Sequence, residues 1–352
     1  MSRPRRAVVT GLLLAVSGMT GALAAPMPPA ALRSPAVQTP RALRAVTLAV
    51  ARAGSRLVAV GERGTVLWSD DGGRQWHQAQ VPVQSTLTAV RFADARVGWA
   101  VGHLGVVLRT EDGGQHWTRQ LDGIQLAQTL LAAATDEASR HAAERLVQEG
   151  ADKPFFDLAV LDGQQAVVVG AYGLALVTRD GGAHWAPLPL AAVNPRGLHL
   201  YGVQLQGPRW VIVGEQGLVL RSEDGGASFS ALASPYKGSF FGLLGSPEGT
   251  LLAYGLRGSA FRSDDAGSHW SRVKIDTPVT LQAGLVAQDG SLLLLAQNGE
   301  LFRSRDQGES FDSLQMPAGP LPAAGLGQAP DGAWILASLR GVRRADPTPP
   351  TP

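Results

Sequence analysis

Three histidines of this chain stand where they could ligate a metal ion. His116, His184 and His269 each come one residue before a tryptophan, and imidazole is a common zinc ligand. A zinc site needs its ligands to converge on one point, but these three residues recur at the same place within an eight-residue repeat. They therefore belong to separate copies of one structural unit, and we expect no metal site. The absence of cysteine also excludes thiolate metal sites, disulfides and a cysteine nucleophile.

The repeat that contains these histidines reads Ser/Thr-x-Asp-x-Gly-x-x-Trp/Phe, and we call it the Asp box. Its six copies begin at residues 69, 110, 178, 222, 263 and 304. Four of the five intervals between these starts measure 41 to 44 residues. The interval between the second and third copies measures 68 residues, which is one period plus 27 further residues. A period near 41 residues is the length of one four-stranded propeller blade.

The aspartate of the Asp box suits a tight turn better than catalysis. Its carboxylate can accept hydrogen bonds from backbone N–H groups, the glycine can adopt a positive φ, and the Ser or Thr can bond to the aspartate. The aromatic residue can then fill the space beneath the hairpin. We interpret as structural the aspartates Asp71, Asp112, Asp180, Asp224, Asp265 and Asp306.

Seven apolar runs that end in glycine or another small residue recur along the chain, from 57–61 to 334–338. Each is followed by a short turn and a further short strand. The sequence therefore predicts an all-β fold, a seven-bladed β-propeller with Asp-box repeats and one helical insertion. The seventh unit ends near Arg344 without an Asp box. Because an unpaired edge exposes backbone groups, we expect residues 36–41 to supply its missing fourth strand.

The start of the chain differs from the repeat. Residues 1–24 combine an arginine-rich head, an apolar stretch and the small-residue pattern Ala22-Leu23-Ala24. This pattern predicts a cleaved secretory signal and a periplasmic location, with a membrane anchor as the alternative. Loss of the signal leaves 28 basic and 29 acidic residues, so nucleic acid is not an expected partner. We expect the exported chain to be a monomer on its own.

Three further segments complete the predicted organisation. A Pro-rich segment at 25–35 precedes the propeller at 36–346, and a Pro-rich tail at 347–352 is expected to be disordered. Residues 121–152, between blades two and three, are rich in helix formers. They predict either one helix or a helical hairpin. Its apolar face either packs on the propeller or docks on another protein.

Candidate binding residues lie in the turns between second and third strands and in the connections between blades. Both sets of loops emerge on the face opposite the Asp boxes, where loops of a rigid scaffold often bind partners. The predicted partner-binding residues are Arg63, Arg257, Arg340, Lys153, Arg196, Lys237, His103, Tyr172 and Glu215. A positive patch here would favour an acidic protein surface, a lipid head group or an anionic sugar. The alternative is a solvated rim of scattered charges.

A glycoside hydrolase of the sialidase type is a competing prediction, because sialidases also carry Asp boxes. Such an enzyme needs an arginine cluster, a tyrosine nucleophile and supporting carboxyl groups. Arg63, Arg257 and Arg340 could provide the cluster, with Tyr172 or Tyr201 and Glu215 nearby. The Phe/Tyr-Arg-Ile-Pro start of sialidases is absent. A further alternative is capture of an anionic sugar in the central channel without chemistry.

Blade two carries a family resemblance. Its segments Gly-Trp-Ala-Val-Gly at 98–102 and Gly-Val-Val-Leu-Arg-Thr-Glu-Asp-Gly-Gly-Gln-His-Trp at 105–117 resemble the Asp-box repeats of the photosystem II stability and assembly factor family. The resemblance spans about residues 42–345. It implies a secreted, non-catalytic accessory factor without a cofactor that acts on a membrane protein complex through a basic patch. Some bacterial relatives are encoded near resistance-nodulation-division transporters, so a transporter is one candidate partner. The insertion departs from the family pattern and leaves the partner open.

Overall fold

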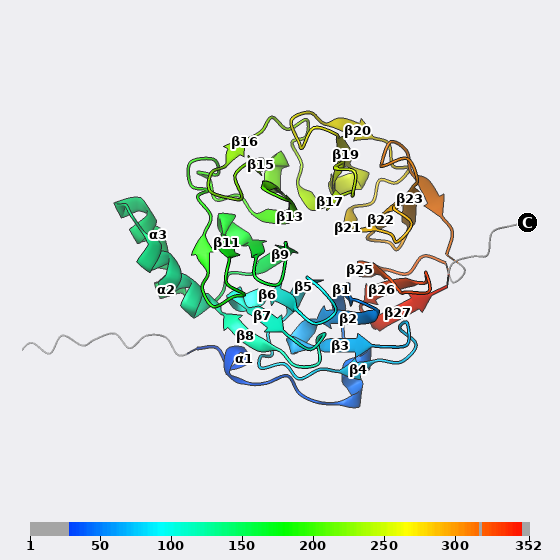
Figure 1. The fold of residues 1–352 in the computed structure, drawn as a ribbon, viewed down its shortest axis with the longest axis horizontal. Helices are drawn as coiled ribbons and strands as arrows, with labels where there is room; N and C mark the ends of the chain where they lie inside the picture. Colours follow the sequence, from blue (N-terminus) through cyan, green and yellow to red (C-terminus); the bar gives the residue numbers. More distant parts are fainter. Residues whose placement is uncertain (1–27, 317–318, 347–352) are drawn as a thin grey trace, which may run out of the picture.

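Seven antiparallel sheets surround a central channel in the computed structural model, which describes residues 28–316 and 319–346 (Figure 1). The predicted signal at 1–24 and the tail at 347–352 lie outside the described residues. The predicted all-β, seven-bladed propeller is confirmed. Blade one contains β1 Thr47–Ala53, β2 Arg56–Gly61, β3 Val66–Ser69 and β4 His77–Gln78. Blade two contains β5 Leu87–Phe92, β6 Gly98–Gly102, β7 Val107–Thr110 and β8 Thr118–Leu121. Blade three contains β9 Phe155–Val160, β10 Ala166–Gly170, β11 Ala175–Thr178 and β12 Ala186–Pro187.

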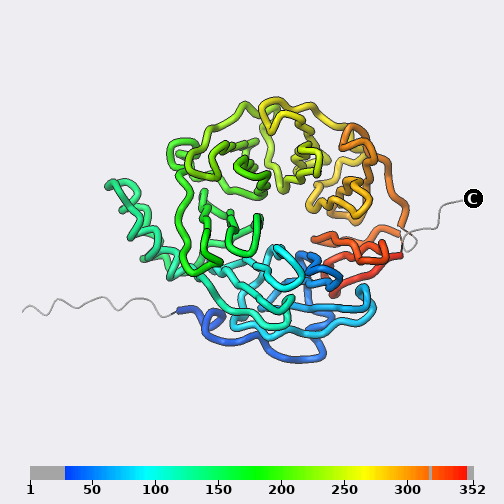
Figure 2. The backbone as a smooth tube through the Cα atoms, in the orientation of Figure 1, coloured from blue at the N-terminus to red at the C-terminus, as the bar shows by residue number. Residues whose placement is uncertain are grey.

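The remaining blades repeat this order, with the first strand beside the channel and the last at the rim (Figure 2). Blade four contains β13 Leu200–Gln206, β14 Arg209–Gly214, β15 Val219–Ser222 and β16 Ser230–Ala231, and blade five contains β17 Phe240–Gly245, β18 Leu251–Gly255, β19 Ala260–Ser263 and β20 Ser271–Val273. Blade six contains β21 Leu281–Val286, β22 Leu292–Ala296, β23 Leu301–Ser304 and β24 Asp312–Leu314. Blade seven contains β25 Ala323–Gln328, β26 Trp334–Ser338 and β27 Gly341–Ala345.

The second strand of each blade forms the core. In β6, β10, β18, β22 and β26 every residue is buried, because neighbouring blades pack on both faces of the strand. A strand covered on both faces needs no polar alternation. This is why the sequence shows continuous apolar runs at these positions. Glycine at the end of the run permits a close approach, since a Cβ on Gly61 would lie 2.0 Å from the carbonyl oxygen of Val46.

The Asp boxes form one recurring hydrogen-bonded loop. In the box of blade three, the Thr178 hydroxyl lies 3.0 Å from Asp180 Oδ1 and accepts the N–H of Gly182 at 2.8 Å. Asp180 Oδ1 also accepts the N–H of His184 at 2.9 Å. These bonds hold the pKa of Asp180 at about 2, with the His184 N–H as the largest cause. The other five boxes repeat the hydroxyl-to-carboxylate and glycine-to-hydroxyl bonds.

Arginine side chains fasten one blade to the Asp-box loop of the next. Arg179 of blade three donates to the carbonyl of Gly225 in blade four at 2.6 Å. Equivalent bonds join other blade pairs: Arg56 to Asp112 and Gly113, Arg221 to Ala266, Arg262 to Gln307, and Arg344 to Gly72. Because the Asp box fixes the loop, its carbonyls are presented at a defined position. We call these contacts the arginine latches.

The prediction that residues 36–41 form the fourth strand of blade seven was wrong. Among the described residues that blade has three strands, β25, β26 and β27. Residues 36–39 bond instead along the rim of blade one, where the N–H of Ala36 reaches the carbonyl of Val81 at 2.9 Å. The chain then enters the short 3-10 helix η1, Pro40–Arg44. Pro40 has no N–H to donate to a ladder, so pairing is interrupted where the strand was expected.

Side chains and packing close the ring in place of that strand. Thr47 Oγ1 of β1 accepts the N–H of Ser338 at 3.0 Å and lies 3.3 Å from the carbonyl oxygen of the same residue in β26. Arg344 joins Asp331 at 2.9 Å and Gly72 of blade one at 2.6 Å. The apolar contact between the same blades is formed by Val50, Leu57, Ala59, Ala329, Ala333 and Ile335.

The insertion between blades two and three is a helical hairpin that projects from the rim of the ring (Figure 1). α2, Gly123–Ala133, begins at the cap Asp122 and buries Leu126 and Ala127. α3, Glu137–Glu149, begins with a capping box formed by Asp136 and Ser139. α2 packs on β12 and on α3, and α3 buries only Ala143. A short helix α1, Ala30–Arg33, precedes the propeller. No helix of the described segments is long and apolar enough to cross a membrane.

The low pKa values of the Asp-box aspartates predict that the fold loses stability in acid. The pKa values of Asp180, Asp224, Asp265 and Asp306 are lowered to about 2, below the ordinary value of about 3.9 in an unfolded chain. Their stabilisation is therefore present above about pH 5 and is lost as the pH falls through 4 toward 2. The melting temperature measured by circular dichroism should follow this course. Asp224→Asn should melt below wild type at pH 7, with a smaller gap at pH 2.5; an equal gap at both would contradict this.

The ring seam supplies a second prediction. Arg344→Gln removes the bonds to Asp331 and to the carbonyl of Gly72 across the seam, so the free energy of unfolding should fall by about 1–2 kcal/mol. Arg343→Gln is the matched control, because Arg343 is exposed and lies next in the same strand. Urea denaturation should show a change below about 0.5 kcal/mol for this control. Equal losses for both variants would exclude a special role of Arg344 in closure.

Candidate functional site

In blades one to five, the turns between second and third strands share an unusual backbone. They form the short 3-10 helices η2 Glu62–Gly64, η3 His103–Gly105, η4 Ala171–Gly173, η5 Glu215–Gly217 and η6 Leu256–Gly258. The middle residue of each has a positive φ, for example 56° at Tyr172 and 54° at Arg257. A left-handed conformation is costly for a residue with a Cβ. We call the face that carries these turns the turn face, and the opposite one the Asp-box face.

The predicted basic residues lie around the turn face without converging. Arg63, Arg257 and Arg340 are exposed on the turns of blades one, five and seven, and their side chains have no hydrogen bond or ion pair within the described residues. His103 and Lys237 are also exposed. Basic groups on separate blades form a dispersed ring of charge. Such a ring suits an extended acidic partner better than a single small anion.

Two other predicted basic residues are already engaged. Lys153 lies 2.8 Å from Glu149 and 2.7 Å from Asp152, and its side chain is only 12% exposed. Burial opposes the charged form, but the hydrogen bonds to these two acids raise the pKa of Lys153. Arg196 donates to the side-chain oxygen of Gln216 at 3.0 Å. Lys153 therefore adds little net positive charge to the turn face.

An aromatic cluster, which sequence reasoning did not assemble, lies on the turn face between blades three and five. The rings of Tyr201 and Phe156 are 5.2 Å apart, those of Tyr201 and Phe241 are 5.3 Å apart, and those of Tyr172 and His199 are 5.0 Å apart. These five residues are the aromatic cluster. Tyr201, Phe156 and Phe241 also line the mouth of the central channel.

Polar contacts orient this cluster. The Nδ1 atom of His199 accepts the backbone N–H of Tyr172 at 2.8 Å, and Glu215 accepts the backbone N–H of His199 at 3.2 Å. Burial, followed by the charge of Glu215, raises the pKa of Tyr201, which favours its neutral phenol. The Tyr172 ring is 61% exposed and lies 5.1 Å from the Lys153 ammonium. A neutral aromatic rim beside backbone groups suits contacts with a peptide.

Inside the channel an ion pair lies between the two mouths. Arg91 of β5 and Asp157 of β9 are 3.1 Å apart, and Asp157 also accepts the N–H of Val203 at 3.3 Å. Burial raises the pKa of Asp157, and the positive charge of Arg91 opposes that rise. Burial also raises the pKa of Tyr254, whose ring lies against Gly242, where a Cβ would clash with it.

The structure does not assemble a metal site or the sialidase groups. His116, His184 and His269 each lie 2.6 Å from the aspartate of their own Asp box, and no cluster of three metal-ligating side chains occurs in the described part of the chain. Tyr201 and Glu215 are neighbours. No described hydrogen bond or ion pair joins them to Arg63, Arg257 or Arg340.

Comparison with known proteins decides the family. The model of the family described as photosynthesis system II assembly factor YCF48 matches residues 69–140 and 136–336. The chain belongs to this YCF48 family. Membership supports an accessory or assembly role in general and favours a non-catalytic one. No curated protein sequence matches the chain.

Solved structures share the fold. A YCF48 bound to a D1 peptide has a TM-score of 0.62 at 17% identity, covering 89% of this chain and 96% of that one. YCF48 from Cyanidioschyzon merolae has a TM-score of 0.62 at 16% identity, covering 88% and 97%. The GH74 enzyme from Niastella koreensis also has a TM-score of 0.62, at 13% identity, covering 86% of this chain and 53% of its own. At these identities the likeness shows the fold alone, which catalytic and non-catalytic proteins share.

The Arg91–Asp157 pair gives a testable pH dependence. Burial raises the pKa of Asp157 in the folded chain, so stability falls as the pH rises and the buried carboxylate ionises. The positive charge of Arg91 reduces that cost. Arg91→Met should therefore lower the free energy of unfolding by about 1–3 kcal/mol at pH 7.5, because a buried charged acceptor loses a partner. The loss should shrink as the pH falls and Asp157 becomes protonated, because its pKa is raised. Chemical denaturation at pH 7.5 and at pH 4 measures it.

The double variant Arg91→Met/Asp157→Asn controls for lost packing. It removes the ionisable group together with its partner, so its stability relative to wild type should vary less between pH 4 and pH 7.5. If Arg91→Met lost the same free energy at both pH values, the ion pair would not be the cause.

Proposed function

We propose that this member of the YCF48 family is a periplasmic accessory factor that binds an exposed segment of a membrane protein through its turn face. Family membership is the observation that carries the proposal. The predicted signal at 1–24 supports export. The aromatic cluster supplies an apolar rim, and the arginines of the surrounding turns supply a dispersed positive field for acidic residues of the partner.

A peptide-binding role fits the structure of this face. Tyr172 combines high exposure with a backbone fixed by His199, so little conformational entropy is lost when a partner covers it. A related YCF48 is bound to a D1 peptide, which supports the same class of ligand here. A transporter of the resistance-nodulation-division type is the candidate partner that we favour, because its periplasmic domains would be accessible to an exported propeller.

Crosslinking on spheroplasts tests whether the chain binds a membrane protein from the periplasmic side. A membrane-impermeant crosslinker is added with the purified exported chain, and captured membrane proteins are identified by mass spectrometry. Arg63→Glu/Arg257→Glu/Arg340→Glu should lose most of the captured partner, because three positive charges on the turn face are reversed. Tyr172→Ala should weaken capture without loss of stability, since its ring is mostly exposed.

A charge-matched variant separates position from net charge. Arg272, Arg305 and Arg343 are exposed and lie away from the turn face, so their joint change to Glu alters the total charge equally. Capture by wild type and by this control, but not by the turn-face variant, would support the proposal. Equal capture by all three would place the contact on the helical insertion. Absence of any membrane partner would refute the function.

A further inference from the structure

A groove lies between the helical hairpin and blade three, at the rim of the ring (Figure 1). We call it the hairpin groove. It has a volume of about 350 Å³, which falls in the range of ligand sites in proteins. One wall is formed by α2 and α3, and the other by the turn 172–175 and by residues of the segment 187–197. The insertion and blade three therefore form this groove together.

α3 lines the groove with a stripe of small and apolar side chains. Ser139, Ala142, Ala143 and Leu146 stand at positions i, i+3, i+4 and i+7, which share one face of a helix. Ala143 is buried, whereas Ala142 and Leu146 remain partly exposed although α3 packs on α2. The charged residues of α3 are all exposed. The hairpin therefore turns apolar surface toward blade three and leaves part of it open to solvent.

The opposite wall is also apolar. Leu188 and Leu190 are buried beneath it, and Pro187 and Pro189 lie nearer its surface. Proline has no N–H to donate, and the N–H of Leu188 already bonds to the carbonyl of Ala175 at 2.9 Å. This wall therefore offers apolar contact and few backbone donors.

The polar side chains of the groove are satisfied, with one exception. The side-chain amide of Asn194 bonds twice to the backbone of Leu198, at 2.9 and 3.0 Å. The Ser139 hydroxyl donates to the carbonyl of Asp136 at 2.9 Å. Within the described residues the Tyr172 hydroxyl has no hydrogen-bond partner, and no lining residue carries a charge. The groove therefore selects an uncharged, mainly apolar occupant, because a charge placed there would lose water without gaining a partner.

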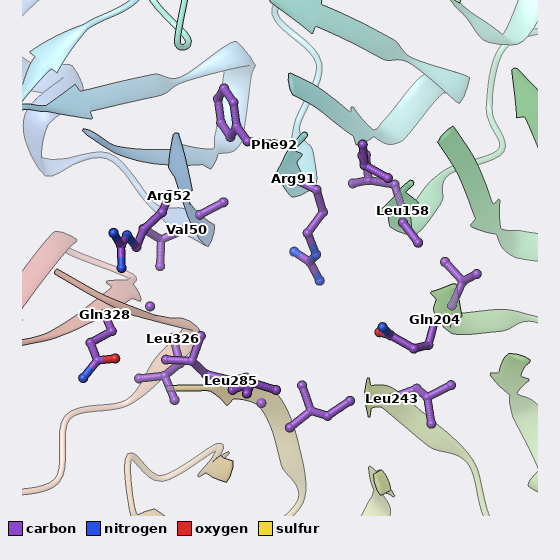
Figure 3. A pocket seen from close by; sticks show the side chains of 18 of the residues that line it. Val50, Arg52, Arg91, Phe92, Leu158, Gln204, Leu243, Leu285, Leu326 and Gln328 are labelled. Atoms are coloured by element: carbon purple, nitrogen blue, oxygen red, sulfur yellow. The ribbon is translucent and has the colours of Figure 1, made fainter. Parts of the chain in front are cut away.

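The central channel has a different character. Figure 3 shows Arg91 and Gln204 reaching into it from separate blades, beside apolar side chains such as Leu243. The lining of the channel thus includes charged and amide groups, which hold water. An apolar chain is therefore more favourably placed in the hairpin groove than in the channel.

Tyr172 connects the hairpin groove to the aromatic cluster. Its ring lies 5.0 Å from the ring of His199 in the cluster and also lines the groove. Gly173, in the same turn, lines the groove as well. A segment that lies on the aromatic cluster can therefore continue past Tyr172 into the groove without leaving the surface of the protein.

We propose that the hairpin groove binds an apolar stretch of the membrane-protein segment that contacts the turn face. This inference rests on the proposed function and specifies the chemistry of the bound segment. Its uncharged apolar residues lie between the hairpin and blade three, and its adjoining residues face the aromatic cluster. At the mouth of the groove the Tyr172 hydroxyl donates to a backbone carbonyl of the segment. A second copy of the chain is the competing occupant.

Leu146→Glu and Val147→Glu form a matched pair of variants. Both place a carboxylate on α3 at adjacent positions, but Leu146 lines the groove, whereas Val147 is 40% exposed and does not line it. In the spheroplast crosslinking assay, Leu146→Glu should reduce partner capture about tenfold, because the groove loses a large apolar contact and gains an unpaired charge. Val147→Glu should capture as wild type does. Melting followed by circular dichroism shows whether each variant is folded.

A photocrosslinking side chain tests the contact without altering the hairpin. Benzoylphenylalanine replaces Pro189, which is exposed and lines the groove, or Ala183, which is exposed in the Asp-box loop of the same blade. Position 189 should crosslink an uncharged apolar stretch of the captured membrane protein, identified by mass spectrometry. Position 183 should not crosslink this protein.

The outcomes separate this inference from the proposed function. If Tyr172→Ala weakens capture but Leu146→Glu does not, and position 189 gives no crosslink to the partner, the proposed function stands and the groove proposal is overturned. Crosslinks from position 189 only to a second copy of the chain also overturn it. If no form of the chain captures a membrane protein, both proposals fall.

Discussion

The arginine latches, which the described residues show at five of the seven blade interfaces, are the directed hydrogen bonds that hold neighbouring blades together. A blade cannot form main-chain ladders with its neighbours, so the angle between blades is set by side-chain packing and by a few directed hydrogen bonds. The Asp box makes such bonds possible, because its carboxylate and hydroxyl fix the loop whose carbonyl accepts the arginine of the preceding blade. The Asp box therefore recurs in the sequence because it shapes a loop that the fold needs. Its aspartates accept hydrogen bonds from the backbone of that loop.

The propeller could be predicted from the sequence because its signals are periodic. The Asp box and the buried second strand recur in phase, so each copy strengthens the interpretation of the others. The course of residues 36–44 could not be predicted in this way, since this segment lies outside the repeat. A proline at residue 40 and the bonds of residues 36–39 with blade one decide its course. Pro40 was the available signal that a strand could not continue there.

The candidate sites were only partly predictable for a related reason. Turn residues such as Tyr172 can be assigned to one face from strand order, whereas the aromatic cluster needs the angular spacing of three blades. Channel-lining residues come from the innermost strands, where polar and apolar residues alternate irregularly across bulges. Charged residues within apolar runs, Arg91 in 87–92 and Asp157 in 155–160, were sequence signals for the channel. That these two residues pair across two blades could be found only from the fold.

The absence of strand exchange at the seam has a topological consequence. Thr47 of β1 and Ser338 of β26 meet at the seam, where β1 also packs against β25. Within residues 28–316 and 319–346 no blade combines strands from both ends of the chain, so each blade is built from strands that follow one another in the sequence. The gene could therefore be permuted at any connection between blades without dividing a sheet. Such a chain would move the seam to another pair of blades and would keep both mouths of the channel intact.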